Sequence, residues 1–142
     1  MGLIATGTET IISRRNGTGS DATPYRFVSL DTTDAEEFAA CGANGVPLGV
    51  LLRNVMYESG LIPSLKWGDI QTDGIADVDA GGAITAGDLV NSDSSGKAVS
   101  VTTHAALSYG TTKKEIAGTA METCASGGRL AVKLCPRTMF IA

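Results

Sequence analysis

The sequence predicts an all-β fold, and three observations support that prediction. Apolar and polar residues alternate with a period of two at residues 28–30 and 130–134, which is typical of half-buried strands. Residues 81–99 read as a glycine-rich turn, a short strand, a polar hairpin turn and a second strand. Eighteen of the 142 residues are glycine and only 5% are aromatic. We therefore expect many turns around a core of Val, Leu, Ile and Ala.

The expected strands follow one another from residue 25 onward. Gly74 interrupts one of them and predicts a bulge or bend. Pro136 disfavours further pairing in a central position of a sheet, and residues 57–68, with the only tryptophan, read as a loop with a strand edge. The expected strands are residues 28–30, 48–52, 69–76, 89–90, 98–101, 116–121 and 130–134.

A short helix and an extended arm complete the expected architecture. Residues 33–40 predict the helix, because a threonine can cap its start and its acidic residues suit the positive end of the helix dipole. Residues 1–24 are rich in Gly, Thr, Ser and Asn and bury little apolar surface, which predicts an N-terminal arm that is mobile or lies across a neighbour. The packed part is then a single domain over residues 25–142.

Composition argues against several classes of partner. The net charge is −4, and the largest basic clusters, Arg14-Arg15 and Lys113-Lys114, are too small for the counterion release on which nucleic-acid binding depends. No apolar run approaches the ~20 residues needed to span a bilayer, so no membrane partner is expected. The three cysteines form no CxxC pair, and the start lacks the features of a signal peptide, which favours synthesis in a reducing cytosol.

The motifs of catalysis and nucleotide binding are missing. His104 is the single histidine, and no G-x-S-x-G motif supplies a nucleophile for it, so it reads as a loop or edge residue. Gly96-Lys97 is followed by Ala98, where a phosphate-binding loop requires Ser or Thr. We therefore expect a protein that is not an enzyme and that needs no cofactor.

Two acidic patterns resemble metal sites. Asn91, Asp93 and Ser95 imitate the first ligands of a calcium loop, but Thr102 stands where a bidentate glutamate is required, so a hairpin turn is preferred. A second acidic series falls on odd-numbered positions, which share one face of a strand, and reads as a solvated face or a rim aimed at a basic partner. This series comprises Asp69, Asp73, Asp77 and Asp79.

Four segments carry a resemblance to a known family. Residues 84–90 read Ile-Thr-Ala-Gly-Asp-Leu-Val, and residues 93–98 fit Asp-x-x-Gly-Lys-Ala. A Gly-x-Ala strand follows at 118–120, and a glycine-rich turn leads into an alternating strand over 127–134. In this order the segments resemble the bacteriophage capsid decoration (head cement) proteins.

The resemblance implies a small β-barrel or β-tulip-like domain that attaches to the outside of the assembled phage head. It further implies the major capsid protein as partner, self-association as a homotrimer, and a protein that is made in the host cytoplasm and resides in the virion. It would stabilise the capsid lattice against the pressure of packaged DNA. The expected contact residues are Ile4, Ile11, Ile12, Arg14 and Arg15 in the arm, with Tyr57 and Trp67 as aromatic anchors.

Two other functions remain open. The element at residues 84–90 also fits a β-clip binding module that recognises a saccharide or a host-surface glycan. An enzyme would require a polar constellation around His104.

Overall fold

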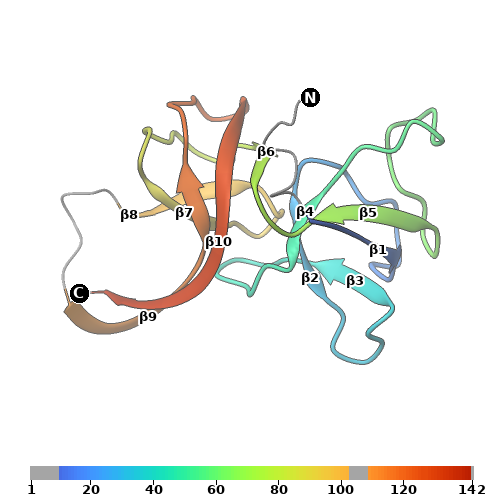
Figure 1. The fold of residues 1–142 in the computed structure, drawn as a ribbon, viewed down its shortest axis with the longest axis horizontal. Coiled ribbons are helices and arrows are strands. Elements are labelled where there is room, and N and C mark those ends of the chain that lie inside the picture. The colour runs from blue at the N-terminus through green and yellow to red at the C-terminus, as the bar shows by residue number, and fades with distance from the viewer. Residues whose placement is uncertain (1–9, 103–108, 142) are drawn as a thin grey trace.

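A computed structural model describes residues 10–102 and 109–141 of the chain. These residues form ten β-strands and no helix, which confirms the all-β prediction. The strands divide into a closed barrel and a second, five-stranded sheet that lie side by side (Figure 1). Their bounds are β1 (Ile11–Asn16), β2 (Phe27–Leu30), β3 (Glu37–Ala40), β4 (Gly49–Leu51), β5 (Trp67–Gln71), β6 (Ile75–Asp79), β7 (Leu89–Ser92), β8 (Ala98–Thr102), β9 (Tyr109–Ala120) and β10 (Arg129–Ile141).

The barrel consists of the first five strands in the order β1-β3-β2-β4-β5. It closes because β1 pairs antiparallel with β5, from Ile11 opposite Gln71 to Arg15 opposite Trp67, and parallel with β3. Apolar side chains fill its interior, and this burial is the main favourable term in folding. The buried set is Ala22, Val28, Phe38, Leu51, Ile62 and Ile70, with Ile12, Leu48 and Tyr57 packed against it.

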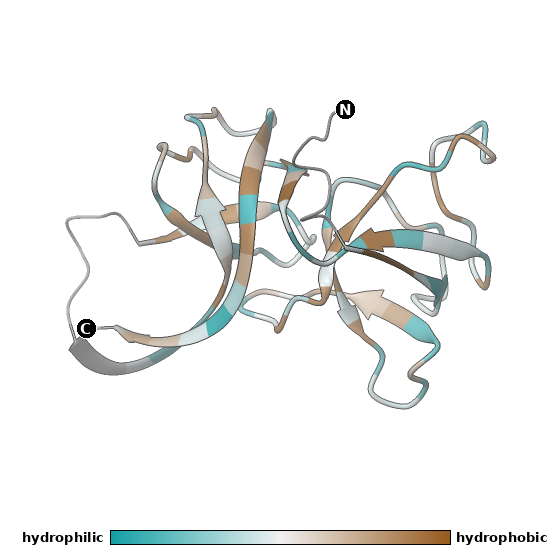
Figure 2. Cartoon of the chain, viewed as in Figure 1, coloured by the Kyte–Doolittle hydropathy of each residue, from teal (hydrophilic) through white to brown (hydrophobic). Residues whose placement is uncertain are grey.

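The second sheet has the order β6-β10-β9-β7-β8 and curls so that its two edges approach each other. Ala80, just after β6, forms a parallel bridge with Ala98 of β8, and the next amide, of Gly81, donates to the Ala98 carbonyl over 2.8 Å. Hydrophobic residues recur along these strands (Figure 2), and many of them form a buried core. The core here contains Ala76, Val78, Ala80, Ile84, Val90, Ala98, Ala117, Ala120, Leu130, Val132 and Leu134.

Tyr25 joins the barrel to the second sheet. Its amide donates to the Leu51 carbonyl of β4 over 2.7 Å, and its carbonyl accepts from Asp79 of β6 over 2.8 Å. The Arg129 guanidinium lies 3.6 Å above the Tyr25 ring and pairs with Asp79 at 2.8 Å. Phe27 and Val50 of the barrel strands also pack into the core of the second sheet. The two units therefore share a packed junction.

The predicted hairpin at residues 89–101 is confirmed as β7 and β8. Asp93 Oδ1 accepts the amides of Ser95 and Lys97 at 2.7 and 2.9 Å, and Gly96 adopts a φ of 81° that glycine tolerates without cost. The pattern weighed as a calcium loop is therefore a turn whose carboxylate is occupied by backbone amides.

The predicted helix at residues 33–40 is wrong. Residues 37–40 form strand β3, and Phe38 points into the barrel core. The preceding turn is held by carboxylates, because Asp31 accepts the amides of Thr33 and Asp34, and Asp34 accepts that of Glu36. Such local bonds offer the backbone an alternative to helix, and a two-turn helix is marginal without packing.

The turn before β3 gives a testable pH dependence. Hydrogen bonds from the Thr33 amide, the Thr33 hydroxyl and the Asp34 amide favour the charged form of Asp31 and lower the pKa of this carboxyl. Because the folded-state pKa is lowered, the charged carboxyl stabilises the turn at pH values above the unfolded pKa of about 3.9. This contribution is lost as pH falls through the folded-state pKa. An NMR titration should give Asp31 a midpoint below the unfolded value, with the Thr33 amide shifting in parallel. A midpoint at or above it would contradict these bonds.

The predicted N-terminal arm is wrong over residues 11–24. Strand β1 belongs to the closed barrel, and Ala22 forms a bridge with Ile62. No local pattern reveals this segment as part of the barrel, because β1 pairs with β5 more than fifty positions away and with β3 22 positions away. Residues 1–9 lie outside the described part of the chain.

Two other expectations are refined. The strand expected at 69–76 is two strands in different sheets, β5 and β6, separated at Gly74 with a φ of 83°. Pro136 lies at a register shift between Leu134 and Arg137, beyond the part of β10 that pairs with β6. The strand continues past it, paired with β9 alone.

Candidate functional site

Strands β1 and β5 bring several of the predicted contact residues together on the outside of the barrel. Ile11, Ser13 and Arg15 lie opposite Gln71, Asp69 and Trp67, and residues directly opposite in an antiparallel pair point to the same side. The Ser13 hydroxyl accordingly donates to Asp69 over 2.8 Å. Half of the Trp67 side chain is exposed, and Ile11 is exposed as well.

Arg15 is held in an internal network. Its guanidinium pairs with Asp34 and Glu37, both at 3.2 Å, and so ties β1 to the turn that precedes β3. Arg15 is partly buried, so these partners leave little of its charge for another molecule.

Ile12 and Arg14 lie on the other side of β1 from Ile11, Ser13 and Arg15, because successive strand residues point to opposite faces. Ile12 packs against the barrel core. Arg14 is half-buried, and its Nη1 donates to the carbonyl of Ser13 over 2.8 Å. The contact roles of the β1 residues stay predictions, and Ile4 lies outside the described residues.

The segment from Leu52 to Lys66 is a loop that projects from the barrel between β4 and β5 (Figures 1 and 2). It carries three exposed large apolar side chains, namely Val55 (88% exposed), Met56 (79%) and Leu65 (62%), and it leads directly into Trp67. We call Val55, Met56, Leu65 and Trp67 the apolar loop surface.

Hydrogen bonds fix the shape of this loop. Asn54 Oδ1 accepts the Met56 amide at 2.9 Å, and the Tyr57 hydroxyl donates to the Trp67 carbonyl at 3.3 Å. Leu65 adopts a left-handed backbone with a φ of 63°, which is unfavourable for a residue with a side chain. The loop therefore holds an exposed leucine in a strained conformation.

Asn16 anchors the base of the loop. It is fully buried at the end of β1, and its Nδ2 donates to the carbonyls of Ser20 and Ile62, both at 2.8 Å. Its Oδ1 accepts the amide and the hydroxyl of Thr18. Its backbone exchanges bonds with Leu65 and Lys66, at 2.9 and 2.8 Å. Asn16 thus joins β1 to both ends of the segment that carries Leu65.

Sequence reasoning found Tyr57 and Trp67 by residue type but missed the rest of this surface. Val55, Met56 and Leu65 follow no helical or strand period, so a pattern search passes over them. Their signal was large apolar residues within a segment that also contains Gly60 and Pro63, because exposed apolar patches mark interaction sites. Asn16 gave no signal, since its role depends on partners up to fifty positions away.

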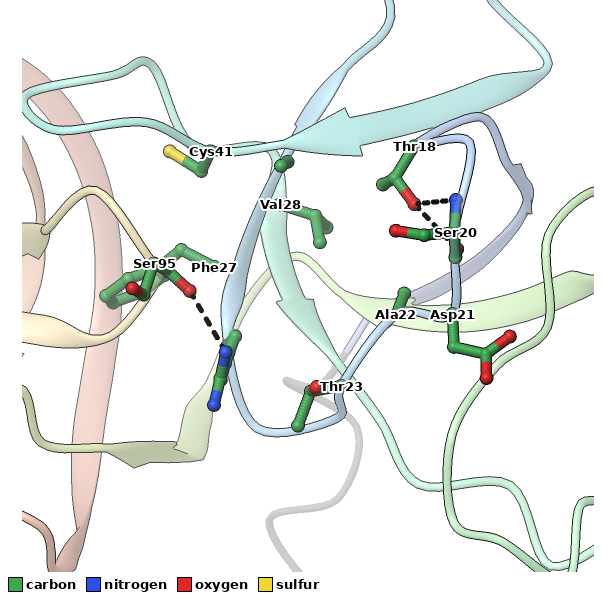
Figure 3. A pocket seen from close by; sticks show the side chains of 11 residues that line it. Thr18, Ser20, Asp21, Ala22, Thr23, Phe27, Val28, Cys41 and Ser95 are labelled. Carbon is green, nitrogen blue, oxygen red and sulfur yellow. Dashed lines mark hydrogen bonds between the residues drawn. The ribbon is translucent and has the colours of Figure 1, made fainter.

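A small pocket lies near the junction of the two sheets (Figure 3). Its volume is about 150 Å³, below the roughly 300–1,000 Å³ typical of small-molecule sites. Phe27, its aromatic lining residue, is buried in the core and cannot offer a ring face to a sugar. The lining residues are Thr18, Ser20, Asp21, Ala22, Thr23, Arg26, Phe27, Val28, Ala40, Cys41 and Ser95.

The acidic series does not form one rim. Asp69 is in the barrel and accepts from Ser13, whereas Asp77 and Asp79 are in the second sheet, and Asp79 pairs with Arg129. Within residues 10–102 and 109–141, no three His, Cys, Asp or Glu side chains gather as metal ligands. Cys41, Cys124 and Cys135 are free thiols, and His104 falls outside the described residues. No helix in the described part of the chain is suited to crossing a membrane.

Comparison with known proteins gives two findings. Residues 62–135, about half of the chain, match the family described as phage cement protein. Among solved structures, the chain is similar to the head fiber gp8.5 N base of bacteriophage phi29, with a TM-score of 0.64 and 18% identity over 89% of this chain and 94% of that one. At this identity the likeness concerns the fold. No curated protein matches the chain.

Proposed function

The chain belongs to the phage cement protein family and is a structural protein of the phage head, and we propose that it binds the outer surface of the assembled head and stabilises the capsid lattice against internal DNA pressure. The partner in this proposal is the major capsid protein. A ligand that binds only the expanded lattice stabilises that state by mass action. Self-association as a homotrimer would engage several capsid subunits at once and raise the effective affinity of each contact.

The observation that carries the proposal is the apolar loop surface. Trp67, Val55, Met56 and Leu65 expose half or more of their surface on one projecting loop and the strand that follows it. Tryptophan is enriched among the residues that dominate binding energy, and Tyr57 ties the loop to the Trp67 backbone. We propose that this surface contacts the capsid and that Ile11, at the other end of the β1–β5 pair, extends the contact.

Replacing Trp67 with alanine is expected to weaken binding to expanded heads by roughly tenfold or more, because the aromatic anchor that the contact would bury is lost. Val55→Ser combined with Met56→Ser should have a similar effect. The measurement is cosedimentation with heads that lack the protein, together with the temperature at which those heads rupture. The expected result is lower occupancy and no gain in rupture temperature at concentrations where the wild type saturates.

Ile75→Ala provides the matched control, because Ile75 is also 50% exposed but lies on β6 in the second sheet. It should bind like the wild type. Unchanged binding of both loop variants would refute the loop as the contact surface, and failure of the wild type to bind heads would refute the proposed function itself.

A further inference from the structure

The outer part of the β9–β10 pair has no other strand beside it among the described residues. β7 pairs with β9 only at Gly118 and Thr119, and β6 pairs with β10 only as far as Lys133. Beyond these points residues 109–116 and 137–141, here called the outer ribbon, pair with each other and curve away from the sheet (Figure 1). Glu115 and Ile116 at its base are buried, and the Glu115 amide donates to Asn44 Oδ1 at 3.0 Å. The rest is a two-stranded ribbon, which is marginally stable alone in water. A partner that packs on it would supply the missing contacts.

The outer ribbon is basic and partly apolar. Its charged residues are Lys113, Lys114, Arg137 and the buried Glu115, which is satisfied within the ribbon by Lys113 at 3.4 Å and Thr138 at 2.8 Å. Phe140 is 58% exposed on the same face as Lys113, because the two residues are register partners. Lys114 and Arg137 lie on the opposite face, with Met139, and a partner that presents carboxylates would complement this second face.

The chain itself carries such a surface in the turn between β2 and β3. Asp31, Asp34, Glu36 and Glu37 fall within seven residues, and Arg15 is the cation that pairs with two of them. Asp31 is occupied by backbone amides. Glu36 is exposed, and its carboxylate has no hydrogen-bond or ion-pair partner among the described residues.

The two charged surfaces lie on opposite sides of the molecule along its longest axis (Figure 1). The ribbon therefore does not meet the acidic turn of its own chain. The chain has 11 Lys and Arg residues against 15 Asp and Glu residues. Three of these basic residues lie on the outer ribbon. Pairing between copies would bring the exposed Glu36 of one copy next to the cations on the ribbon of another.

We infer that the outer ribbon of one copy docks on the acidic β2–β3 turn of a second copy. This inference rests on the self-association included in the proposed function and names the surfaces that carry it. The contact joins two different patches, so it is head-to-tail, and such an interface closes into a ring when the rotation between copies permits. Charge pairs at the contact supply orientation and partner choice.

Charge reversal tests the inference on the full chain. Arg137→Glu and Glu36→Arg should each weaken self-association by roughly tenfold, since an attraction becomes a repulsion. The chain carrying both changes should recover association, because each contact regains opposite charges. Sedimentation equilibrium at low and high salt measures this, and the wild-type association should weaken as salt rises. Arg53→Glu, at an exposed arginine outside both surfaces, serves as the control and should associate like the wild type.

The outcomes separate the two levels of proposal. Wild-type self-association that neither single variant weakens, or that the double variant fails to restore, overturns the ribbon contact but leaves self-association standing. A wild type that is monomeric overturns both. If Arg137→Glu instead weakens binding to heads and leaves self-association unchanged, the ribbon's partner is the capsid and the inference is wrong.

Discussion

Replacing Gly118 with alanine is expected to lower the free energy of unfolding by about 3 kcal/mol. A Cβ at this position of β9 would lie 2.1 Å from the carbonyl oxygen of Lys133 and 2.9 Å from its carbonyl carbon. Both are backbone atoms of the paired strand β10, so no side-chain rotation relieves the contact. The two strands must move apart where Val132 and Leu134 fill the core.

Chemical denaturation of the wild type and the variant measures this loss. Gly82→Ala is the matched control, because the nearest atom to its added Cβ is Val99 Cγ1 at 3.9 Å, an ordinary contact. Its stability should stay within about 0.5 kcal/mol of the wild type. If Gly118→Ala lowers the free energy of unfolding no more than Gly82→Ala does, the close approach of Gly118 to the Lys133 carbonyl is contradicted.

Gly49 has the same role in the barrel. Its Cβ would lie 2.2 Å from the carbonyl oxygen of Gln71 in the paired strand β5. Residues 47–51 and 116–120 both place a glycine among small and apolar strand residues. In each unit the glycine lets one strand approach the carbonyl of its neighbour. The two glycines therefore have the same physical role, one in the closed barrel and one in the sheet that curls nearly closed.

The elements that could be predicted from the sequence are those with a pattern in neighbouring residues, such as strand alternation or a turn motif. Alternation at residues 28–30 and 130–134 and the turn at residues 93–97 revealed β2, β10 and the β7–β8 hairpin, and each is confirmed. Strand β1 was missed because Ile11 and Ile12 are adjacent rather than alternating, and its pairing with β5 is set by distant residues. Strand β3 was misread because Glu and Ala favour helices locally, whereas burial of Phe38 decides the outcome.

The same division holds for the candidate site. Trp67 and Tyr57 stood out by type, and both lie where the loop meets β5. The arrangement of Arg15 with Asp34 and Glu37 could not be foreseen, because it requires the parallel pairing of β1 with β3. The sequence predicted that Arg14 and Arg15 contact a partner from a free arm, but Arg15 lies in a barrel strand and pairs with residues of its own chain.

Replacing Asn16 with alanine is expected to destabilise the protein by about 3 kcal/mol. The change removes two donated bonds and the acceptor of the Thr18 amide, and it leaves the carbonyl of Ile62 without this partner. An unsatisfied buried polar group costs about 1–3 kcal/mol. Because the Asn16 side chain also holds the carbonyl of Ile62 within the loop that carries Leu65, the variant should bind heads more weakly even where it remains folded.

Asn16→Asp separates hydrogen bonding from packing at this position. It preserves the size and the oxygen that accepts from Thr18, but at neutral pH its second oxygen faces the carbonyls of Ser20 and Ile62. That repulsion and burial raise the pKa of the introduced carboxyl above its unfolded value, so the penalty is greatest at neutral pH and eases as pH falls and the group binds a proton. Thr18→Ala, which removes a partly exposed hydroxyl that bonds to Asn16 and Ser20, should cost only about 1 kcal/mol. Denaturation at pH 7 and pH 5 measures all three variants, and an Asn16→Ala loss no larger than that of Thr18→Ala would show that Asn16 does not anchor the loop.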